Sequence, residues 1–258
     1  MYKTTIVTAY FNLPKSKANH DTYTEWMQNM LIINNPMIIF CDPSSEEQLQ
    51  NFRKEYLHIT KIIPLEFKEF YSYKYFQNFV NDYNTKDHER YHNPYLYLIW
   101  NEKTNFLKNA VELNPFTSEY FLWVDIGCFR KPNTQYINWP NTTKINTLDK
   151  NKILLLGVNP FLQHEYNCTE LKNLTDFKYI GGRIGGTIFG GTSATILKWH
   201  ELYYEMLEYF IKIDRFIGKD QNIMNSIAVI NKDFVQIINP DYFENDNRWF
   251  ALQEYLNS

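Results

Sequence analysis

Residues 120–127 read Tyr-Phe-Leu-Trp-Val-Asp-Ile-Gly, a run of large apolar residues that ends in a carboxylate and a glycine. Five consecutive apolar residues followed by a turn signal predict a buried strand. Asp125 comes directly after that strand, where ligands bind in open α/β sheets, and its carboxylate suits a metal ion or a ribose hydroxyl. A simple Asp-x-Gly turn explains the same residue equally well. Asp125 is therefore a candidate site residue, and the run predicts a central strand.

Short apolar segments alternate with helical patterns on both sides of this run, which predicts an α/β fold with a largely parallel sheet. No linker divides the sequence, so we expect one domain over residues 1–258. Residues 68–95, dense in Tyr, Phe and Asn, are predicted to form an insertion or loop-rich flap. The other expected strands are 4–11, 37–41, 61–67, 153–158 and 234–238, and the expected helices are 22–33, 44–56, 96–113, 195–213 and 220–230.

Composition excludes several classes of protein. With 44 % hydrophobic and 17 % aromatic residues the chain can build a large core. A net charge of −3 without a basic stripe disfavours binding to nucleic acid. Three cysteines without a C-x-x-C pair, no signal peptide and no long apolar segment predict a cytoplasmic protein without a transmembrane helix. Peripheral contact with a membrane stays open.

Six of the nine glycines lie between Gly181 and Gly191, where residues 186–189 are expected to form a strand or hairpin. The dinucleotide fingerprint does not fit, because it belongs between a first strand and its helix, and no Gly-Lys-Ser/Thr follows to make a phosphate loop. Two interpretations remain. The glycines allow either a tight hairpin with close packing or a flat backbone surface for a hydroxyl-rich ligand.

Lys219-Asp220-Gln221 opens the last long predicted helix, where Asp220 suits the N-cap position. Lys219 is a candidate phosphate ligand or simply a solvated charge. The six histidines show no metal-ligand spacing, and His200 is expected on the exposed side of its helix. No G-x-S-x-G nucleophile elbow occurs. Zinc hydrolysis and serine-nucleophile chemistry are therefore not predicted.

Six motifs taken together resemble the HtrL/YibB family, whose members occur in bacterial surface-polysaccharide loci and are regarded as GT-A-type glycosyltransferases. The resemblance implies a GT-A-like domain with a mixed, mostly parallel sheet between helices. It also implies transfer of a sugar from a nucleotide-sugar donor, expected to be a UDP-sugar, to a hydroxyl of a glycan acceptor. The motifs are Thr8-Ala-Tyr-Phe11, Trp100-Asn-Glu-Lys103, Asn114-Pro-Phe116, Phe121-Leu-Trp-Val-Asp-Ile-Gly127, Gly185-Gly-Thr-Ile-Phe-Gly-Gly191 and Lys219-Asp-Gln-Asn-Ile-Met-Asn225.

The resemblance assigns the nucleotide to residues 1–130. Thr8 and Tyr10 would hold the nucleotide, and Lys103 would face the donor phosphates. Asp125 would match the first carboxylate of the Asp-x-Asp motif, which binds ribose and Mn²⁺ or Mg²⁺. The chain departs from that motif because Gly127 stands in place of its second carboxylate.

The missing carboxylate leaves two ways to neutralise the leaving diphosphate. A divalent ion would use Asp125 with a later residue such as Asp241 or Asp246. Alternatively, Lys103 or Arg130 would neutralise the diphosphate without a metal.

The resemblance assigns the sugar and the acceptor to residues 131–258. Asp220 would lie beside the transferred sugar, as the base of an inverting reaction or as a stabiliser of the positive sugar in a retaining one. Two rival functions stay open, a non-catalytic carbohydrate-binding protein and a nucleotide-sugar hydrolase or phosphotransferase. The residues expected to line the sugar and acceptor cleft are Gly185, Gly186, Thr187, Gly190, Gly191, Lys219 and Gln221.

Overall fold

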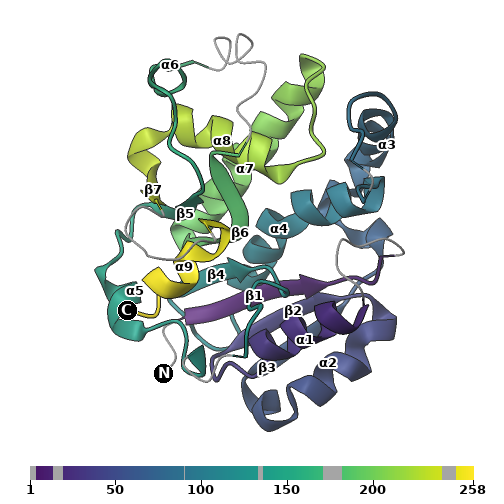
Figure 1. Cartoon of the computed structure of the whole chain (residues 1–258), viewed down its shortest axis with the longest axis vertical. Helices are drawn as coiled ribbons and strands as arrows, with labels where there is room; N and C mark the ends of the chain where they lie inside the picture. The colour runs from purple at the N-terminus through teal and green to yellow at the C-terminus, as the bar shows by residue number, and fades with distance from the viewer. Residues whose placement is uncertain (1–3, 14–19, 90, 133–135, 171–181, 240–247) are drawn as a thin grey trace.

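The computed structural model describes residues 4–13, 20–89, 91–132, 136–170, 182–239 and 248–258. Its centre is a seven-stranded sheet in the order β3-β2-β1-β4-β6-β5-β7 (Figure 1). Strand β6 is antiparallel to both neighbours, and every other adjacent pair is parallel. The predicted mixed, mostly parallel sheet is thereby confirmed. The strands are β1 Thr4–Tyr10, β2 Met37–Cys41, β3 Thr60–Pro64, β4 Tyr120–Val124, β5 Ile153–Gly157, β6 Ile184–Thr192 and β7 Val235–Ile238.

Helices cover both faces of the sheet, because side chains alternate along each strand between two apolar cores. Phe121 and Trp123 of β4 face one core, and Leu122 and Val124 face the other. The first core packs against α3 (Phe76–Thr85), α4 (Pro94–Leu113), α7 (Ser193–Lys212) and α8 (Asp220–Ile230). The second packs against α1 (His20–Leu31), α2 (Glu46–Phe52), α5 (Thr142–Thr147) and α9 (Ala251–Tyr255). The short helix α6 spans Gln163–Tyr166.

The expected loop-rich flap at residues 68–95 is wrong for most of its length. Short 3₁₀ helices, Phe67–Glu69 and Tyr71–Tyr75, lead into α3. Phe79 of α3 is fully buried and contacts Tyr97 of α4 edge-on, with ring centroids 6.4 Å apart. The aromatic density of this segment therefore serves packing against α4.

The expected helix at residues 44–56 is broken at Arg53, which has non-helical backbone angles after α2. The Arg53 side chain is fully buried, and its guanidinium donates hydrogen bonds to the carbonyls of Leu31, Ile33 and Asn35. A buried guanidinium must satisfy its donors internally. Arg53 therefore ties the end of α2 to the turn between α1 and β2.

The glycine run forms one strand, β6, and not a hairpin. Gly190 pairs with Leu122 of β4, and a Cβ at position 190 would lie 2.1 Å from the carbonyl oxygen of Phe121. Close packing therefore explains this glycine. Gly181 lies outside the described residues.

Three further observations concern His200, the cysteines and the helices as membrane spans. His200 of α7 is only 9 % exposed and contacts the rings of Tyr71 and Tyr204, so the expected exposed position is wrong. All three cysteines are buried and free. Among the described helices, none combines the length and the apolar character that a membrane crossing needs.

Candidate active site

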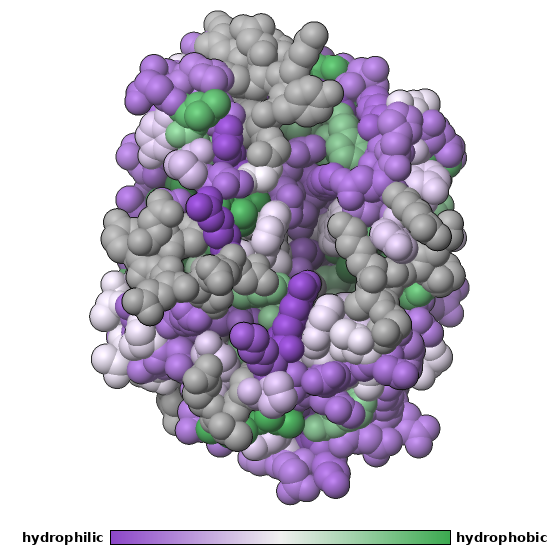
Figure 2. Space-filling view, in the orientation of Figure 1, coloured by the Kyte–Doolittle hydropathy of each residue, from purple (hydrophilic) through white to green (hydrophobic). Residues whose placement is uncertain are grey.

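A cavity of about 1150 Å³ opens at the carboxyl ends of β1 and β4. Figure 2 shows a recess near the middle of this face, over the region between β4, β6 and α4 in Figure 1. The walls come from distant parts of the sequence: Tyr10 ends β1, Asp125 follows β4, Lys103 belongs to α4, Gly186 to β6 and Asp220 to α8. This is the edge of the sheet where ligands bind in open α/β folds.

A lysine joins two carboxylates at the bottom of the cavity. Lys103 Nζ lies 3.0 Å from Asp125 Oδ1, 3.0 Å from Asp220 Oδ2 and 2.8 Å from the carbonyl oxygen of Gly186. Lys103 is buried, and burial lowers its pKa, but the charges of Asp125 and Asp220 outweigh that effect and raise the pKa above its usual value. Lys103 is therefore a permanent ammonium, and the three side chains form a preorganised triad.

Asp125 is held by its strand. Its backbone N–H donates to the carbonyl of Thr187 at 2.8 Å, which extends the pairing of β4 with β6 by one residue. The indole N–H of Trp123 donates to Asp125 Oδ1 at 2.8 Å. Burial and the Asp220 charge raise the pKa of Asp125, against the opposing effect of Lys103. About a third of the side chain stays exposed to the cavity, so Asp125 can contact a ligand while it remains fixed.

Asp220 is the first residue of α8, and the N-cap position belongs to Lys219. The predicted N-cap role of Asp220 is therefore wrong. Asp220 Oδ1 accepts a hydrogen bond from the N–H of Gln221 at 2.9 Å, which fixes the carboxyl group at the start of the helix. A Cβ at position 186 would lie 2.4 Å from Asp220 Oδ2. Gly186 is therefore required because the carboxylate packs directly on its backbone.

The structure brings most of the remaining predicted site residues to the cavity, but not all of them. The buried Thr8 hydroxyl contacts the sulfur of Met30 behind the cavity wall. Asp241 and Asp246 lie outside the described residues. The predicted residues that line the cavity besides the triad are Tyr10, Gly127, Arg130, Gly186, Thr187, Lys219 and Gln221. Those that do not are Thr8, Gly185, Gly190 and Gly191.

Aromatic side chains form a wall of the cavity around the predicted Tyr10 and Arg130, and the sequence interpretation missed Tyr23, Trp26 and Phe250. Tyr10 and Tyr23 stack with ring centroids 6.1 Å apart, and Trp26 lies next to Tyr23. The Arg130 guanidinium lies 4.3 Å above the Trp26 ring and 4.7 Å from that of Phe250. These residues are scattered along the chain, so the high aromatic content was their only signal.

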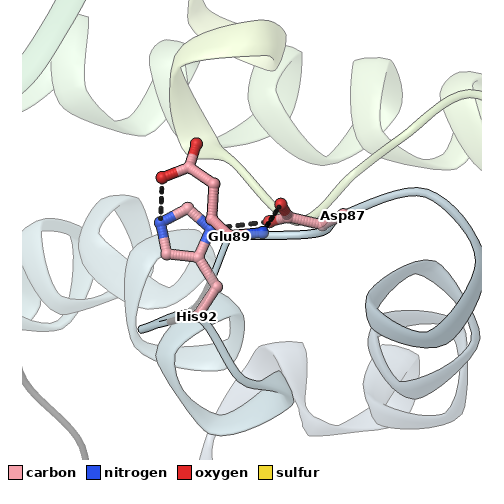
Figure 3. A group of neighbouring side chains, drawn as sticks. All are labelled: Asp87, Glu89 and His92. Carbon is pink, nitrogen blue, oxygen red and sulfur yellow. Dashed lines mark hydrogen bonds and ion pairs between the residues drawn. The ribbon is translucent and has the colours of Figure 1, made fainter.

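A second polar cluster, Asp87, Glu89 and His92, lies at the rim of the cavity (Figure 3). One ligand atom of each lies within 4.8 Å of the others, so the cluster could hold a metal ion. The expectation that no histidine has metal-ligand spacing is therefore wrong. His92 contacts Asp87 Oδ2 through Nδ1 at 2.6 Å and Glu89 Oε2 through Nε2 at 3.3 Å, and Lys219 contacts Glu89 Oε1 at 2.5 Å.

Within this cluster the Asp87 carboxylate already accepts hydrogen bonds from protein groups. Burial raises the pKa of Asp87, but hydrogen bonds from Tyr97 and His92 overcome this and lower it to about 2. The cluster thus holds the segment before α4 against Lys219, next to Asp220, without needing an ion.

Comparison with known proteins places this geometry in context. The family described as "Bacterial protein of unknown function (HtrL_YibB)" matches residues 2–252. Protein HtrL of Escherichia coli (strain K12) is 25 % identical over 235 residues, which cover 80 % of this chain and 76 % of that protein.

Solved structures share the fold. Mouse xyloside xylosyltransferase 1, in its apo form, aligns with a TM-score of 0.50 and 13 % identity over 92 % of this chain and 85 % of its own. The 4-diphosphocytidyl-2C-methyl-D-erythritol synthase of Anaerococcus prevotii aligns with a TM-score of 0.40 and 11 % identity over 99 % and 95 %. The alignment with the xylosyltransferase gives the chain a GT-A-like α/β fold.

Proposed function

The chain belongs to the HtrL/YibB family, and from this premise we propose that it is a glycosyltransferase acting in polysaccharide biosynthesis. It would move a sugar from a nucleotide-sugar donor, first of all a UDP-sugar, to a hydroxyl of a glycan acceptor in the cytoplasm. The observation that carries the proposal is the Asp125–Lys103–Asp220 triad at the bottom of the cavity. The fold that surrounds this cavity is also that of a xylosyltransferase.

In this proposal residues 1–130 hold the nucleotide. The stacked Tyr10 and Tyr23 offer a flat surface of the size of a base, and Asp125 offers a carboxylate for ribose hydroxyls. Gly127 keeps the approach open, because a Cβ there would meet the Tyr23 ring at 3.1 Å. Arg130 supplies positive charge for the diphosphate.

Residues 131–258 would hold the sugar and the acceptor. Gly186, Thr187, Lys219 and Gln221 surround Asp220 in the cavity wall. Lys103 and the start of α8 hold the Asp220 side chain in place. It would deprotonate the acceptor hydroxyl of an inverting reaction, a role that contributes about 10²–10⁴-fold, or face the positive sugar of a retaining one.

The resemblance to the Asp-x-Asp motif also implies Mn²⁺ or Mg²⁺ at Asp125, and the residues present do not fit such an ion. The third position of the motif is Gly127, and Asp125 Oδ1 already contacts Lys103 Nζ and Trp123 Nε1. A divalent ion on Asp125 Oδ1 would have to displace a buried ammonium. Among the described residues the set of donors that suits a metal is Asp87, Glu89 and His92.

The test is a panel of UDP-, GDP- and CMP-sugars, incubated with and without a glycan acceptor. Nucleotide release that increases with acceptor is the expected result. Asp125→Ala and Asp220→Asn should each lower that release by at least about 100-fold. Unchanged turnover in both variants would show that the site is elsewhere.

A second function, carbohydrate binding without catalysis, is favoured by one observation, the loss of the second Asp-x-Asp carboxylate at Gly127. Binding of a nucleotide-sugar without turnover in the same panel would support it. Turnover that does not respond to any acceptor would instead indicate a hydrolase or phosphotransferase.

A further inference from the structure

We propose that Lys103 takes the place of a divalent metal ion in this site, so that the nucleotide-sugar binds and reacts without a metal. The inference rests on the proposed function and adds the source of positive charge. It is carried by the position of one ammonium group between two carboxylates, by the charge of the resulting triad, and by a separate guanidinium in the same cavity.

The ammonium occupies the position that a bridging ion would need. Lys103 Nζ is equidistant from Asp125 and Asp220, at 3.0 Å from each, and its third neighbour is the carbonyl oxygen of Gly186 at 2.8 Å. Three oxygens thus surround a group with three hydrogens. A Mg²⁺ ion that bridged the same two oxygens from the side of Nζ, at its usual distance of about 2.0–2.1 Å, would overlap Nζ. Ion and lysine therefore exclude each other.

Burial makes displacement of the lysine costly. Lys103 lies in the middle of α4 and is only 5 % exposed, so moving the ammonium away would break its contacts with Asp125, Asp220 and the carbonyl oxygen of Gly186. Moving a metal ion in would leave a buried ammonium without its partners, an arrangement that proteins avoid. The carboxylates that could attract an ion are thus already neutralised in part by a group that cannot leave.

The charge of the triad indicates which part of the substrate it faces. Two carboxylates and one ammonium carry a net charge of −1, which repels a diphosphate and stabilises a sugar that becomes positive in the transition state. The diphosphate needs another cation. Among the described residues, no carboxylate pairs with Arg130, whose guanidinium rests on Trp26 and Phe250 and lines the cavity.

The inference therefore divides the work of a metal between two side chains. Lys103 holds the two carboxylates together and sets their orientation toward the sugar. Arg130 binds the diphosphate and stabilises it as the bond from the sugar carbon to the phosphate oxygen breaks. The electron pair of that bond stays on the diphosphate, and the acceptor oxygen forms the new bond and gives its proton to a base such as Asp220.

The first test measures metal and ligand binding separately. Binding of Mn²⁺ alone is followed by electron paramagnetic resonance, and binding of UDP by calorimetry after treatment with EDTA. We expect that EDTA changes the Kd of UDP by less than about threefold, and that Arg130→Gln weakens binding by about 10- to 100-fold. A Mn²⁺ signal that Asp125→Asn abolishes and Glu89→Gln preserves would overturn the inference.

A matched control separates the two candidate metal positions. Glu89→Gln removes a donor from the rim cluster, and Asp125→Asn removes one from the triad. A Mn²⁺ signal lost only in Glu89→Gln would place the ion at the rim and support a metal-free triad.

The second test creates the missing metal site. In a Glu89→Gln background, which lacks the rim donor, Lys103→Ala leaves two facing carboxylates, so Mn²⁺ should raise the Tm of the double variant while it leaves the Tm of Glu89→Gln unchanged. Equal effects of Mn²⁺ on both proteins would contradict the inference. The wild-type measurements above decide the matter even where Lys103→Ala fails to fold. If UDP did not bind with or without Mn²⁺, the proposed function would be contradicted. The Mn²⁺ measurement on wild type would still show whether the triad binds a metal ion.

Discussion

The contact between Gly186 and Asp220 shows how one residue without a side chain sets the position of a carboxylate. Because a Cβ at position 186 would lie 2.4 Å from Asp220 Oδ2, Gly186→Ala should push that oxygen away from Lys103 Nζ. A displacement of about 1 Å at a reacting group costs up to about 100-fold. We expect kcat/KM of Gly186→Ala to fall by about 10- to 100-fold on the donor that the panel identifies.

Gly185 provides the matched control in the same strand. A Cβ there would meet Val158 at 2.8 Å and Leu156 at 2.9 Å, in the core and away from the cavity. Gly185→Ala should therefore lower the free energy of unfolding by about 1–3 kcal/mol and leave kcat/KM unchanged for the folded protein. If both variants lost the same activity, the Gly186 effect would be one of general strain.

At the residue scale the sequence predicted positions better than it predicted partners. Asp125 and Asp220 could be found because a strand end and a helix start are visible in local pattern. That Lys103 stands between them could not be derived, because this depends on the packing of α4 against β4 and α8. The cavity position predicted for Gly190, inside β6, is wrong for the same reason. Gly190 packs on the backbone of the neighbouring strand and does not line the cavity.

At the scale of elements, α4 and α7 meet through two buried titratable groups with opposite pH responses. Asn105 of α4 lies between them: its Nδ2 donates to Glu102 Oε1 at 2.6 Å, and its Oδ1 contacts His200 Nε2 at 3.3 Å. Burial raises the pKa of Glu102 to about 7, although Ser72 donates to the carboxylate. Burial, with help from the Lys108 charge, lowers the pKa of His200 to about 4.

These shifts predict opposing slopes of stability against pH. Between pH 4.5 and about 7 the folded chain binds more protons than the unfolded chain at Glu102, so the free energy of unfolding falls as pH rises. Between about pH 4 and 6.5 the unfolded chain binds more protons at His200 than the folded chain does, so the free energy of unfolding rises with pH. Each effect is on the order of 1–3 kcal/mol.

Removing either group should reveal the slope of the other. Urea unfolding from pH 4.5 to 6.5 should show stability rising with pH in Glu102→Gln and falling with pH in His200→Gln. Parallel curves for the two variants would mean that neither group titrates in this window.

Helices and strands could be predicted where local periodicity determines their bounds, and could not where tertiary contacts determine them. Helix α8 begins and ends at the predicted residues, because its apolar stripe and its first turn are local features. Residues 68–95 were wrongly predicted to be a loop-rich flap, because their mixture of polar and aromatic residues shows no local periodicity. The aromatic rings pack on α4, a contact that the local sequence does not reveal. Arg53 ends α2 through carbonyls about 20 residues earlier, which no local pattern shows.

At the scale of the whole molecule, the sheet follows from alternation of strands and helices, but the cavity does not. Its walls join residues before position 131, such as Lys103 and Arg130, with residues after position 181, such as Asp220 and Phe250. Only the folded sheet brings these two sets together. The cavity is therefore the feature by which a ligand can couple the two halves of the chain.

That coupling predicts how the whole chain responds to UDP. A ligand that touches both sets of residues and binds only the folded state should stabilise it by about 2.7 kcal/mol at 100 times its Kd, which raises Tm by about 5–10 °C. Hydrogen exchange should slow in residues 125–130 when UDP binds, and also in the first turn of α8 when a UDP-sugar binds, because both segments line the cavity. Arg130→Gln, which weakens binding by about 10- to 100-fold, should reduce that stabilisation to about 0.4–1.4 kcal/mol at the same ligand concentration. Protection confined to residues 125–130 with the UDP-sugar as well would mean that the sugar does not reach Asp220, which would contradict the role proposed for the triad.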